Sequence, residues 1–391
     1  MNFMRGIERS ASLYIHIPFC NTFCDYCDFY SIKKNSVNDD YIGAFLSVLI
    51  NDIKYQIEYF NIKEIPAAYI GGGTPSVLGE KIRTLFAALR AIPAFSPKEF
   101  SVEANPESLT EDFLNACLEG GVNRLSLGVQ TFHEPSRAAV NRAGSCASGS
   151  LIEESLVLSS KYYGSRNGLS LSADLITGLP FHNEEIVKED IKRLLAFEPS
   201  HVSLYSLSVE NGTPLQEKLQ SKTVILPDID ISDSLWLTGR EALLKAGFEH
   251  YEVSNFAHNK NRCLHNTRYW QMESWIGAGP AASGTIVNEE TATARRFTFV
   301  HDTDAYIREQ LTMDNKKIVD LEELDREAFL KDSLLMGFRC KEGPDPERFF
   351  RRFGSTIKDC IPKTLARWKE KDNMLFLNQF LSEAFDELSK H

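Results

Sequence analysis

The stretch Ser12-Leu-Tyr-Ile-His-Ile-Pro-Phe-Cys20-Asn-Thr-Phe-Cys24-Asp-Tyr-Cys27 places three cysteines directly after a run of apolar residues. Residues 12–17 have the length and β-branched content of a short buried strand, and Pro18 ends it. The loop that follows has the spacing Cys-x3-Cys-x2-Cys. This spacing brings three thiols within reach of one another, just beyond the end of a predicted strand.

The number of thiols in this loop separates two kinds of metal site. A structural zinc site closes its shell with four ligands, whereas a [4Fe–4S] cluster held by three cysteines keeps one iron open to a further ligand. We therefore predict that Cys20, Cys24 and Cys27 hold a [4Fe–4S] cluster whose open iron binds S-adenosylmethionine (SAM). Two alternatives stay open from the cysteines alone: a zinc knuckle completed by His16 or a distant residue, and three ordinary thiols.

The composition is typical of a soluble globular protein. The chain has 391 residues, of which 43% are hydrophobic and 25% charged, and this length allows one large core and a smaller appended domain. It contains neither an apolar run of about eighteen residues nor an N-terminal signal stretch, so we expect no transmembrane segment and a cytoplasmic location. The net charge of −11 argues against nucleic acid as a partner. Five scattered cysteines are interpreted as packing residues: Cys117, Cys146, Cys263, Cys340 and Cys360.

Short β-rich runs alternate with helical patterns in the first half of the chain. The predicted strands are Leu13–Ile17, Ala67–Ile70, Phe100–Glu103, Arg124–Val129, Ser170–Ile176 and Val202–Leu207. The predicted helices are Asp40–Tyr59, Gly79–Ala91, Thr110–Glu119, Leu151–Tyr163 and Glu184–Phe197. Such a repeat implies a parallel sheet with right-handed crossovers. Six units fit a partial (β/α)6 barrel better than a closed eightfold one, so the predicted class is α/β, with a doubly wound sheet as the alternative.

The pattern changes in the second half of the chain. A helix is predicted near Ser232–Ala246, and an aromatic-rich stretch follows it. The last part reads as helices with one β-like run, Asn373–Leu377, which predicts a small, mainly helical and winged-helix-like domain. The predicted division is a barrel over residues 10–230, a barrel extension over 231–310 and a C-terminal domain over 311–391.

Polar and glycine-rich residues gather at the predicted strand ends, where βα barrels carry their active sites. Gly71-Gly72-Gly73-Thr74-Pro75 follows the second strand, and its glycines let a ligand approach the backbone. Glu103 and Asp174 can accept hydrogen bonds from the amine or the ribose of SAM, and Gln130 can bridge polar groups. Arg142 can pair with the SAM carboxylate. Singly, each is as well explained by a tight turn or a surface ion pair; together they predict one site, in which we assign no catalytic residue.

These motifs resemble the radical SAM family that contains oxygen-independent coproporphyrinogen III dehydrogenases and the related haem chaperones, the HemW-like proteins. The matching segments are Tyr14–Cys20, Gly71–Pro75, Glu103–Pro106, Arg124–Phe132, Asn141-Arg142 and Asp174–Pro180. The resemblance implies a radical SAM barrel with a cluster and SAM. It places the family's SAM contacts on Tyr14, Gly72, Gly73, Thr74, Glu103, Gln130, Arg142 and Asp174.

Two positions resemble the chaperone branch of this family. The dehydrogenases have a further cysteine two residues after the third, and this chain has Phe29 there. The segment His265-Asn-Thr-Arg-Tyr-Trp270 matches the His-Asn-x-x-Tyr-Trp motif that the chaperone branch carries and that is linked to haem binding. An imidazole is a common axial ligand of haem, and aromatic neighbours suit a flat macrocycle. Without the motif, His265 reads as a hydrogen-bonded core histidine.

The resemblance implies a chaperone that binds haem and passes it to acceptor haem proteins, with membrane respiratory enzymes as the expected class, and that takes electrons for its cluster from a donor protein. Radical catalysis on haem is not required by this interpretation. Two alternatives are oxidative decarboxylation of coproporphyrinogen III and a radical SAM reaction on another substrate such as RNA. Phe29 argues against the first, and the acidic composition argues against the second.

Overall fold

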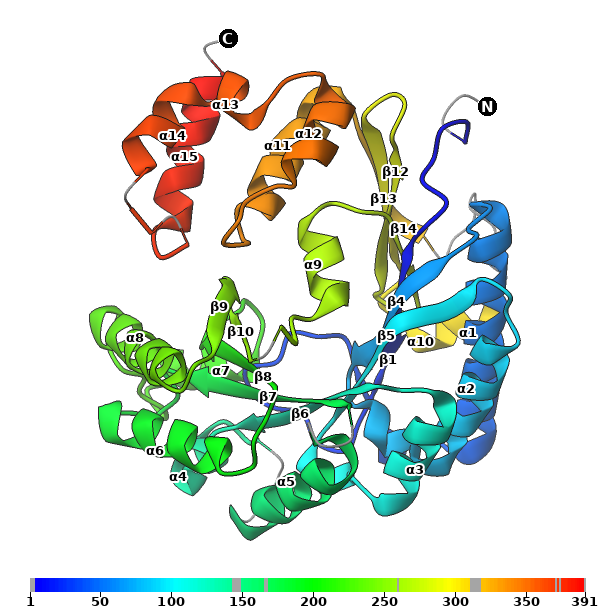
Figure 1. Ribbon diagram of the computed structural model, residues 1–391. Helices are drawn as coiled ribbons and strands as arrows, with labels where there is room; N and C mark the ends of the chain where they lie inside the picture. The colour runs from blue at the N-terminus through cyan, green and yellow to red at the C-terminus, as the bar shows by residue number, and fades with distance from the viewer. Residues whose placement is uncertain are drawn as a thin grey trace.

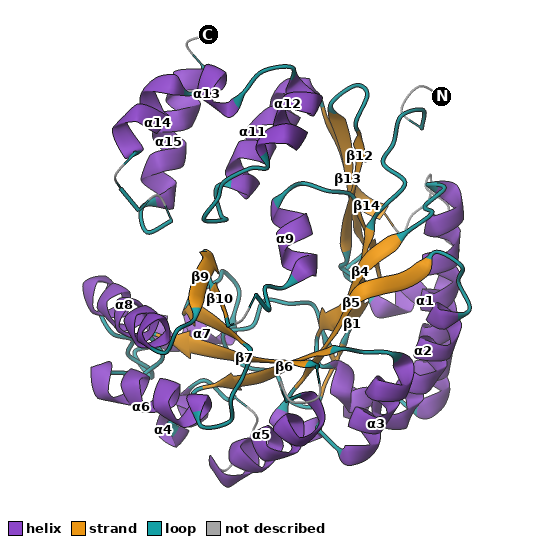
Figure 2. Cartoon of the chain, viewed as in Figure 1, coloured by secondary structure: helices purple, strands orange, loops and turns teal. Residues whose placement is uncertain are grey.

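The computed structural model describes residues 4–142, 149–164, 168–258, 260–309, 318–369, 371–372 and 374–389. Most strands form one curved twelve-stranded sheet, and helices cover its outer, convex face (Figures 1 and 2). The packing role predicted for Cys146 falls outside the described residues. The other four scattered cysteines are unbonded thiols, and Cys117, Cys263 and Cys340 are buried.

The elements have the following bounds. The strands are β1 (Ser12–Ile17), β2 (Phe19–Cys20), β3 (Ile32–Lys33), β4 (Ile65–Gly72), β5 (Phe95–Ala104), β6 (Arg124–Gln130), β7 (Ser170–Thr177), β8 (His201–Ser206), β9 (Glu249–Glu252), β10 (Asn255–Ala257), β11 (Trp275–Ala278), β12 (Ser283–Asn288), β13 (Thr293–Phe299) and β14 (Ile318–Leu324). The α-helices are α1 (Asp39–Tyr59), α2 (Ile82–Arg90), α3 (Glu111–Gly120), α4 (Glu134–Ala139), α5 (Gly149–Tyr163), α6 (Glu184–Leu195), α7 (Pro214–Gln220), α8 (Ile229–Lys245), α9 (Leu264–Trp270), α10 (Thr303–Arg308), α11 (Arg326–Gly337), α12 (Pro346–Phe353), α13 (Ile357–Cys360), α14 (Pro362–Trp368) and α15 (Leu377–Leu388). Three short 3-10 helices are η1 (Lys34–Ser36), η2 (Pro75–Lys81) and η3 (Pro106–Ser108).

The centre of the sheet is parallel and follows the chain. Its order is β14-β13-β12-β11-β1-β4-β5-β6-β7-β8-β10-β9, and β1, β4, β5, β6, β7 and β8 pair in parallel. The order of these six strands never reverses, so the doubly wound alternative, which needs a reversal, is wrong. The two ends of the sheet, β14 and β9, do not pair with each other. The predicted partial (β/α)6 barrel is therefore confirmed.

Residues 231–310 supply both flanks of the parallel core. At one edge β11 pairs in parallel with β1 and continues antiparallel into β12 and β13. At the other edge β10 pairs antiparallel with β8 and then with β9. Between these flanks, α9 lies on the concave side of the sheet (Figure 1). The segment that was predicted as a barrel extension thus borders the barrel on both sides.

Two predicted elements differ from the structure. The helix predicted over Gly79–Ala91 begins only at Ile82, because Gly79 has φ 53° and ψ −133° and separates it from a preceding 3-10 turn. The β-like run predicted at Asn373–Leu377 is wrong: residues 374–376 form a turn and Leu377 starts α15, while Asn373 lies outside the described residues. A continuous apolar run over so few residues also fits the turn and first residue of an amphipathic helix.

The core has two main parts. The larger one fills the space between the parallel strands and helices α1 to α5, where Phe45, Phe100 and Phe113 are fully buried. The second core joins the C-terminal helices to the extension, with Phe329 and Phe380 in the same apolar cluster as Val287 of β12. In the range 311–391 the structure shows one strand, β14, which joins the sheet, and then five helices. The domain boundaries themselves stay a prediction.

Candidate SAM and iron–sulfur site

The cysteine loop lies beyond β1 and beside the glycine loop that follows β4. Cys20 Sγ lies 3.5 Å from Thr74 Oγ1, within hydrogen-bonding distance for sulfur. Burial, together with the neighbouring Cys24 and Cys20, raises the pKa of Cys27 to about 11. The three thiols are unbonded and partly exposed. Three unbonded thiols in one short loop are a donor set that fits an iron–sulfur cluster.

His16 is not free to complete a zinc site. Its Nε2 donates to the carbonyl oxygen of Tyr30 at 2.9 Å, and its Nδ1 accepts from the hydroxyl of Tyr14 at 3.2 Å. Burial lowers the pKa of His16 to about 4, so the ring is neutral. Within the described residues, no group of three His, Cys, Asp or Glu side chains is arranged to hold a single metal ion. The two hydrogen bonds of His16 argue against the zinc knuckle.

A cavity of about 400 Å³ opens beside this loop, at the carboxyl ends of the parallel strands. Nine predicted residues line it: Cys24, Cys27, Gly72, Gly73, Thr74, Glu103, Gln130, Arg142 and Asp174. The structure thus brings together residues from five strand ends. Tyr14, Cys20 and His265 are not among the lining residues. The volume lies within the range of small-molecule sites.

Two carboxylates face this cavity in different surroundings. Glu103 Oε1 accepts a 2.7 Å hydrogen bond from the hydroxyl of Tyr69, and burial raises the pKa of Glu103 to about 7. Both oxygens of Asp174 accept from Ser126 Oγ at 3.2 Å, and burial also raises the pKa of Asp174. Each carboxylate retains acceptor capacity toward the cavity. They are therefore able to accept hydrogen bonds from a cationic or hydroxylated ligand.

The glycines of the loop after β4 are required by close neighbours within the protein as well as by the approach of a ligand. A Cβ on Gly71 would lie 2.9 Å from the Glu103 carboxyl group, and one on Gly73 would lie 2.7 Å from the carbonyl oxygen of Phe19. Gly72 has φ 104°, a conformation that side chains rarely adopt. Gln130 has φ 67° at the irregularity between β6 and β7. Positive φ at a non-glycine residue in a cavity is strain of the kind found at functional sites.

Arg142 connects the cavity to the cysteine loop. Its Nη2 donates to Gly128 O at 2.6 Å and to Asn105 Oδ1 at 2.8 Å, while Nη1 donates to Cys24 Sγ at 3.5 Å. The side chain is buried, so its charge acts on Cys24 with little screening. Asn105 also donates to Thr74 Oγ1 at 3.0 Å. Asn105 was not predicted as a site residue. It nevertheless lies directly after β5, and position at a strand end was the feature that identified the other predicted site residues.

His265 lies one layer beneath the cavity. Its ring centroid is 5.3 Å from that of Tyr69 and 6.5 Å from that of Tyr14, and the residue is 8% exposed. Burial lowers the pKa of His265 to about 4. The aromatic residues of its motif do not stack on it: Tyr269 packs against Trp275, and Arg339 lies over the Trp270 ring. His265 thus stands apart from the residues that line the cavity.

Comparison with known proteins agrees with this geometry. Residues 14–194 match the radical SAM superfamily. The chain is 32% identical to the haem chaperone HemW of Lactococcus lactis over 89% of this chain and 86% of that protein. It is 34% identical to HemW of Escherichia coli over 70% of each chain. It is 32% identical to mouse radical S-adenosyl methionine domain-containing protein 1, mitochondrial, over 85% of this chain and 74% of that protein.

The chain belongs to the HemW-like family of radical SAM proteins. The coproporphyrinogen III oxidase HemN of E. coli has a similar structure, with a TM-score of 0.75 over 96% of this chain and 90% of that one. Its sequence is 20% identical, so this likeness shows the fold alone. The resemblance predicted from the sequence motifs is confirmed. Membership in this family implies that a [4Fe–4S] cluster and SAM are bound.

In this HemW-like chain, Phe29 occupies the rim of the SAM cavity. It lines the cavity and is 66% exposed, so no neighbouring side chain buries it. Other residues that line the cavity were not predicted as site residues: Tyr26, Ser126, Tyr205 and Glu210. Ser126 and Tyr205 lie on β6 and β8, and their inward direction could be expected only once the register of those strands was known.

Proposed function

We propose that this protein binds haem and delivers it to acceptor haem proteins, with a [4Fe–4S] cluster and SAM bound at its barrel mouth. The observation that carries the proposal is the 32% identity, over 89% of the chain, to a protein named as a haem chaperone. Such a match is too long to be confined to the barrel. Haem chaperoning, rather than a reaction on a porphyrin, is therefore the function that we assign.

Each cofactor-binding residue has a role under this proposal. Cys20, Cys24 and Cys27 hold the cluster, whose open iron, when present, provides a coordination position for the amine and carboxylate of SAM. Glu103 and Asp174 accept hydrogen bonds from the amine and the ribose hydroxyls. The remaining contacts are assigned to Tyr14, Gly72, Gly73, Thr74, Gln130 and Arg142. Tyr14 and Cys20 do not line the cavity as it stands, so they act at its margin.

Arg142 already donates hydrogen bonds to protein groups, so we do not assign it to the SAM carboxylate alone. Two of its donors are taken by Gly128 and Asn105, and a third points at Cys24. The guanidinium thus positions the cysteine loop and supplies positive charge next to the sulfurs, where it stabilises the anionic cluster. A SAM carboxylate bound at the cluster would share the same positive field.

The acceptor class and the location also belong to this proposal. We assign membrane respiratory haem proteins as acceptors, a cytoplasmic location, and a separate protein as the electron donor of the cluster. No helix among the described residues is long and apolar enough to span a membrane.

His265 is the residue that the motif links to haem. Its Nδ1 is buried and has no hydrogen-bond partner among the described residues. The neutral ring keeps a lone pair that could bind iron. Haem could reach this nitrogen only if α9 moved away from Tyr69. His265 therefore acts, on this proposal, in a rearranged state rather than in the closed packing of the barrel.

Decarboxylation of coproporphyrinogen III is the second candidate, because the fold resembles that of HemN. Phe29 disfavours it, since the dehydrogenase branch has a cysteine at this position. One preparation tests both functions: the anaerobically reconstituted full chain is titrated with haem and separately incubated with coproporphyrinogen III, SAM and a reductant. We expect a saturable haem spectrum and no protoporphyrinogen. Robust protoporphyrinogen formation, or the absence of haem binding, would overturn the assignment.

A further inference from the structure

The side-chain amide of Asn105 joins two contacts that reach different cysteines of the loop. Its Oδ1 accepts a 2.8 Å hydrogen bond from Arg142 Nη2, and its Nδ2 donates to Thr74 Oγ1 at 3.0 Å. Arg142 Nη1 lies 3.5 Å from Cys24 Sγ, and Thr74 Oγ1 lies 3.5 Å from Cys20 Sγ. A continuous chain of hydrogen-bonding side chains therefore connects two of the three predicted cluster ligands.

The chemistry of these groups fixes the direction of the hydrogen bonds. A guanidinium has donors and no acceptor, so the amide oxygen of Asn105 has to face Arg142 and its NH2 group has to face Thr74. Thr74 Oγ1 accepts from Asn105, and its own hydroxyl proton stays free to donate to Cys20. A cysteine sulfur that binds iron has lost its proton and can only accept. Both ends of the chain would then point donors at sulfurs.

The side chain of Asn105 does not serve the local turn. Asn105 directly precedes η3, and an asparagine before a helix commonly caps it with its side chain. No side-chain capping bond is present here. The backbone amide of Asn105 donates to Ser76 Oγ at 3.2 Å, and the residue lines the SAM cavity. The amide of Asn105 is therefore used for the site and not for the helix start.

Gly128 of β6 leaves the space in which Arg142 and Asn105 meet. A Cβ at Gly128 would lie 2.7 Å from Arg142 Nη2 and 2.7 Å from Asn105 Oδ1, closer than non-bonded atoms approach. Gly128 does not have a positive φ, so its backbone conformation does not require glycine. Its carbonyl oxygen accepts from Arg142 Nη2 at 2.6 Å. The glycine at this position is thus explained by the contact between the two side chains.

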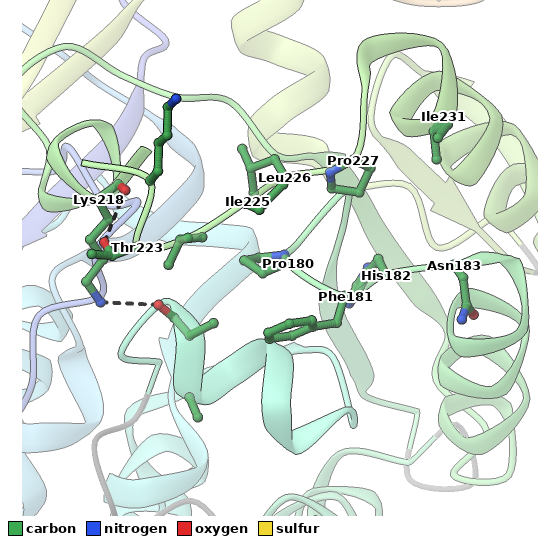
Figure 3. Close-up of a pocket in the computed structure, with 14 residues that line it drawn as sticks. Pro180, Phe181, His182, Asn183, Lys218, Thr223, Ile225, Leu226, Pro227 and Ile231 are labelled. Carbon is green, nitrogen blue, oxygen red and sulfur yellow. Dashed lines mark hydrogen bonds between the residues drawn. The ribbon is translucent and has the colours of Figure 1, made fainter. Parts of the chain in front are cut away.

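The outer side of the cysteine loop is held in a different way. There Lys218 lines a separate cavity of about 870 Å³, between the loop from β7 to α6 and the segment between α7 and α8 (Figure 3). Lys218 Nζ donates to Asp25 Oδ2 at 2.5 Å and to Ala139 O at 3.2 Å. Asp25 belongs to the cysteine loop but is not one of its predicted ligands. This contact holds the loop at a carboxylate, whereas the chain through Asn105 ends on the sulfurs.

We propose that Asn105 is a positioning residue of the cluster site and that it raises the reduction potential of the cluster. It acts through Thr74 and Arg142, which it holds against the sulfurs of the cysteine loop. One-electron reduction makes a cluster more negative, and hydrogen bonds to its sulfurs and nearby positive charge stabilise the reduced form. Removing the amide should therefore make the cluster harder to reduce. The proposal rests on the cluster of the proposed function and is independent of how haem is bound.

The test is a reductive titration of the reconstituted full chain with dithionite, followed by electron paramagnetic resonance at known potentials. Asn105→Leu keeps the approximate size of the side chain and removes its hydrogen bonds. We expect the equilibrium constant for reduction to fall about tenfold, which is a shift of about 59 mV to a more negative potential for a one-electron couple. Gly128→Ala should shift the potential in the same direction, because its methyl group separates Arg142 from Asn105. If Asn105→Leu loads no iron, Gly128→Ala decides, since it keeps every hydrogen-bonding group.

Asn123→Leu is the matched control. The Asn123 amide also uses both of its ends, donating to Lys98 O and accepting from Phe100 N, each at 2.8 Å. Asn123 directly precedes β6, so it lies at the opposite end of the parallel strands from the cluster site. Its loss should leave the potential at the wild-type value. Thr74→Val should lower the potential, and it should add less in Asn105→Leu than in wild type if the two residues act together.

The outcomes distinguish this proposal from the proposed function. Wild-type protein that forms no iron–sulfur cluster would contradict the cluster itself. Unchanged potentials in both Asn105→Leu and Gly128→Ala, or a loss of iron without a shift in the clusters that remain, would overturn the role of Asn105. An equal shift in Asn123→Leu would overturn it too. A shift in the two cavity variants that is absent from the control supports the proposal.

Discussion

Arg142, Glu103 and Asp174 show what single residues do at the mouth of this barrel. Each is charged when exposed to water, and each lies instead in surroundings that shift its pKa. Arg142 is stabilised in its charged form by groups around the cysteine loop, whereas burial favours the neutral forms of the two carboxyl groups. A cationic ligand would stabilise the charged form of the two carboxylates, which burial away from water destabilises.

The first prediction concerns the cluster. Anaerobically reconstituted wild-type protein should contain about four irons per chain. Cys20→Ala, Cys24→Ala or Cys27→Ala should each abolish the iron–sulfur absorption, because only three thiols are available in the loop. Cys117→Ala, at a buried core position, should retain it. Tight stoichiometric zinc without iron–sulfur absorption would show that the loop is a zinc site.

The second prediction concerns SAM binding. Arg142→Ala should weaken SAM binding by about 1.5–3 kcal/mol, the contribution of hydrogen bonds to charged groups, and calorimetry of the cluster-loaded protein measures it. Iron content has to be determined for the same sample, since Arg142 also contacts Cys24. Unchanged SAM affinity at full iron content would mean that Arg142 serves only the cysteine loop.

The third prediction is a pH dependence of the cluster-free protein. The pKa of Glu103 is about 7 in the folded chain, above its ordinary value of 4.5, so folding favours the protonated form. The stability that this proton supports is complete below pH 4.5 and is lost as the pH rises toward 7. Glu103→Gln removes this loss. We expect the variant to gain about 1–3 kcal/mol over wild type between pH 5 and pH 8 in urea denaturation. If the variant differed from wild type in unfolding free energy by the same amount at pH 5 and at pH 8, burial would not raise the pKa of Glu103.

At the scale of elements, Glu99 of β5 fixes the start of α9. Glu99 Oε2 accepts a hydrogen bond from Leu264 N at 2.8 Å, and Oε1 accepts one from His265 N at 3.0 Å. The carboxylate therefore caps the first backbone amides of α9. Arg124 Nη1 lies 3.9 Å from the same carboxylate and is 5% exposed. The Glu99–Arg124 pair therefore holds His265 beneath the SAM cavity.

The fourth prediction tests this pair. Glu99→Ala should destabilise the protein by about 3–5 kcal/mol, because it leaves the buried Arg124 guanidinium without its anionic partner. It should also loosen α9 and change any haem spectrum that depends on His265. Glu241→Ala is the control: its pair with Lys245, at 3.7 Å on the exposed face of α8, should be worth less than about 1 kcal/mol. Chemical denaturation of both variants measures the difference.

The sequence patterns predicted the parallel strands better than the helix starts and the chain end. In Arg124–Val129, Leu and Val alternate with polar or small residues, and such alternation is a local signal for a strand. The start of α2 depended on the backbone of Gly79, and the turn at 374–376 depended on packing against α14 and α15. The flanks of the sheet were not predicted, since each joins the parallel core through strands far apart in the chain: β10 pairs with β8, and β11 pairs with β1.

At the scale of the whole molecule, the SAM site was predictable because a parallel barrel collects its strand ends at one mouth. Nine of the twelve predicted residues line the same cavity, from Cys24 in the first loop to Asp174 on β7. His265 did not follow this rule: it lies on a helix packed beneath the mouth, where no strand order could place it.

The central claim is that the chain hands haem to an acceptor by direct contact. Haem-loaded protein is mixed with respiratory membranes from haem-deficient cells, and the transfer rate is measured by absorbance. Passive release is measured in parallel with apomyoglobin as a trap for free haem. The account predicts that transfer to the membranes accelerates with the amount of membrane and exceeds the rate of passive release. A transfer rate that never exceeds passive release, at any amount of membrane, would contradict it.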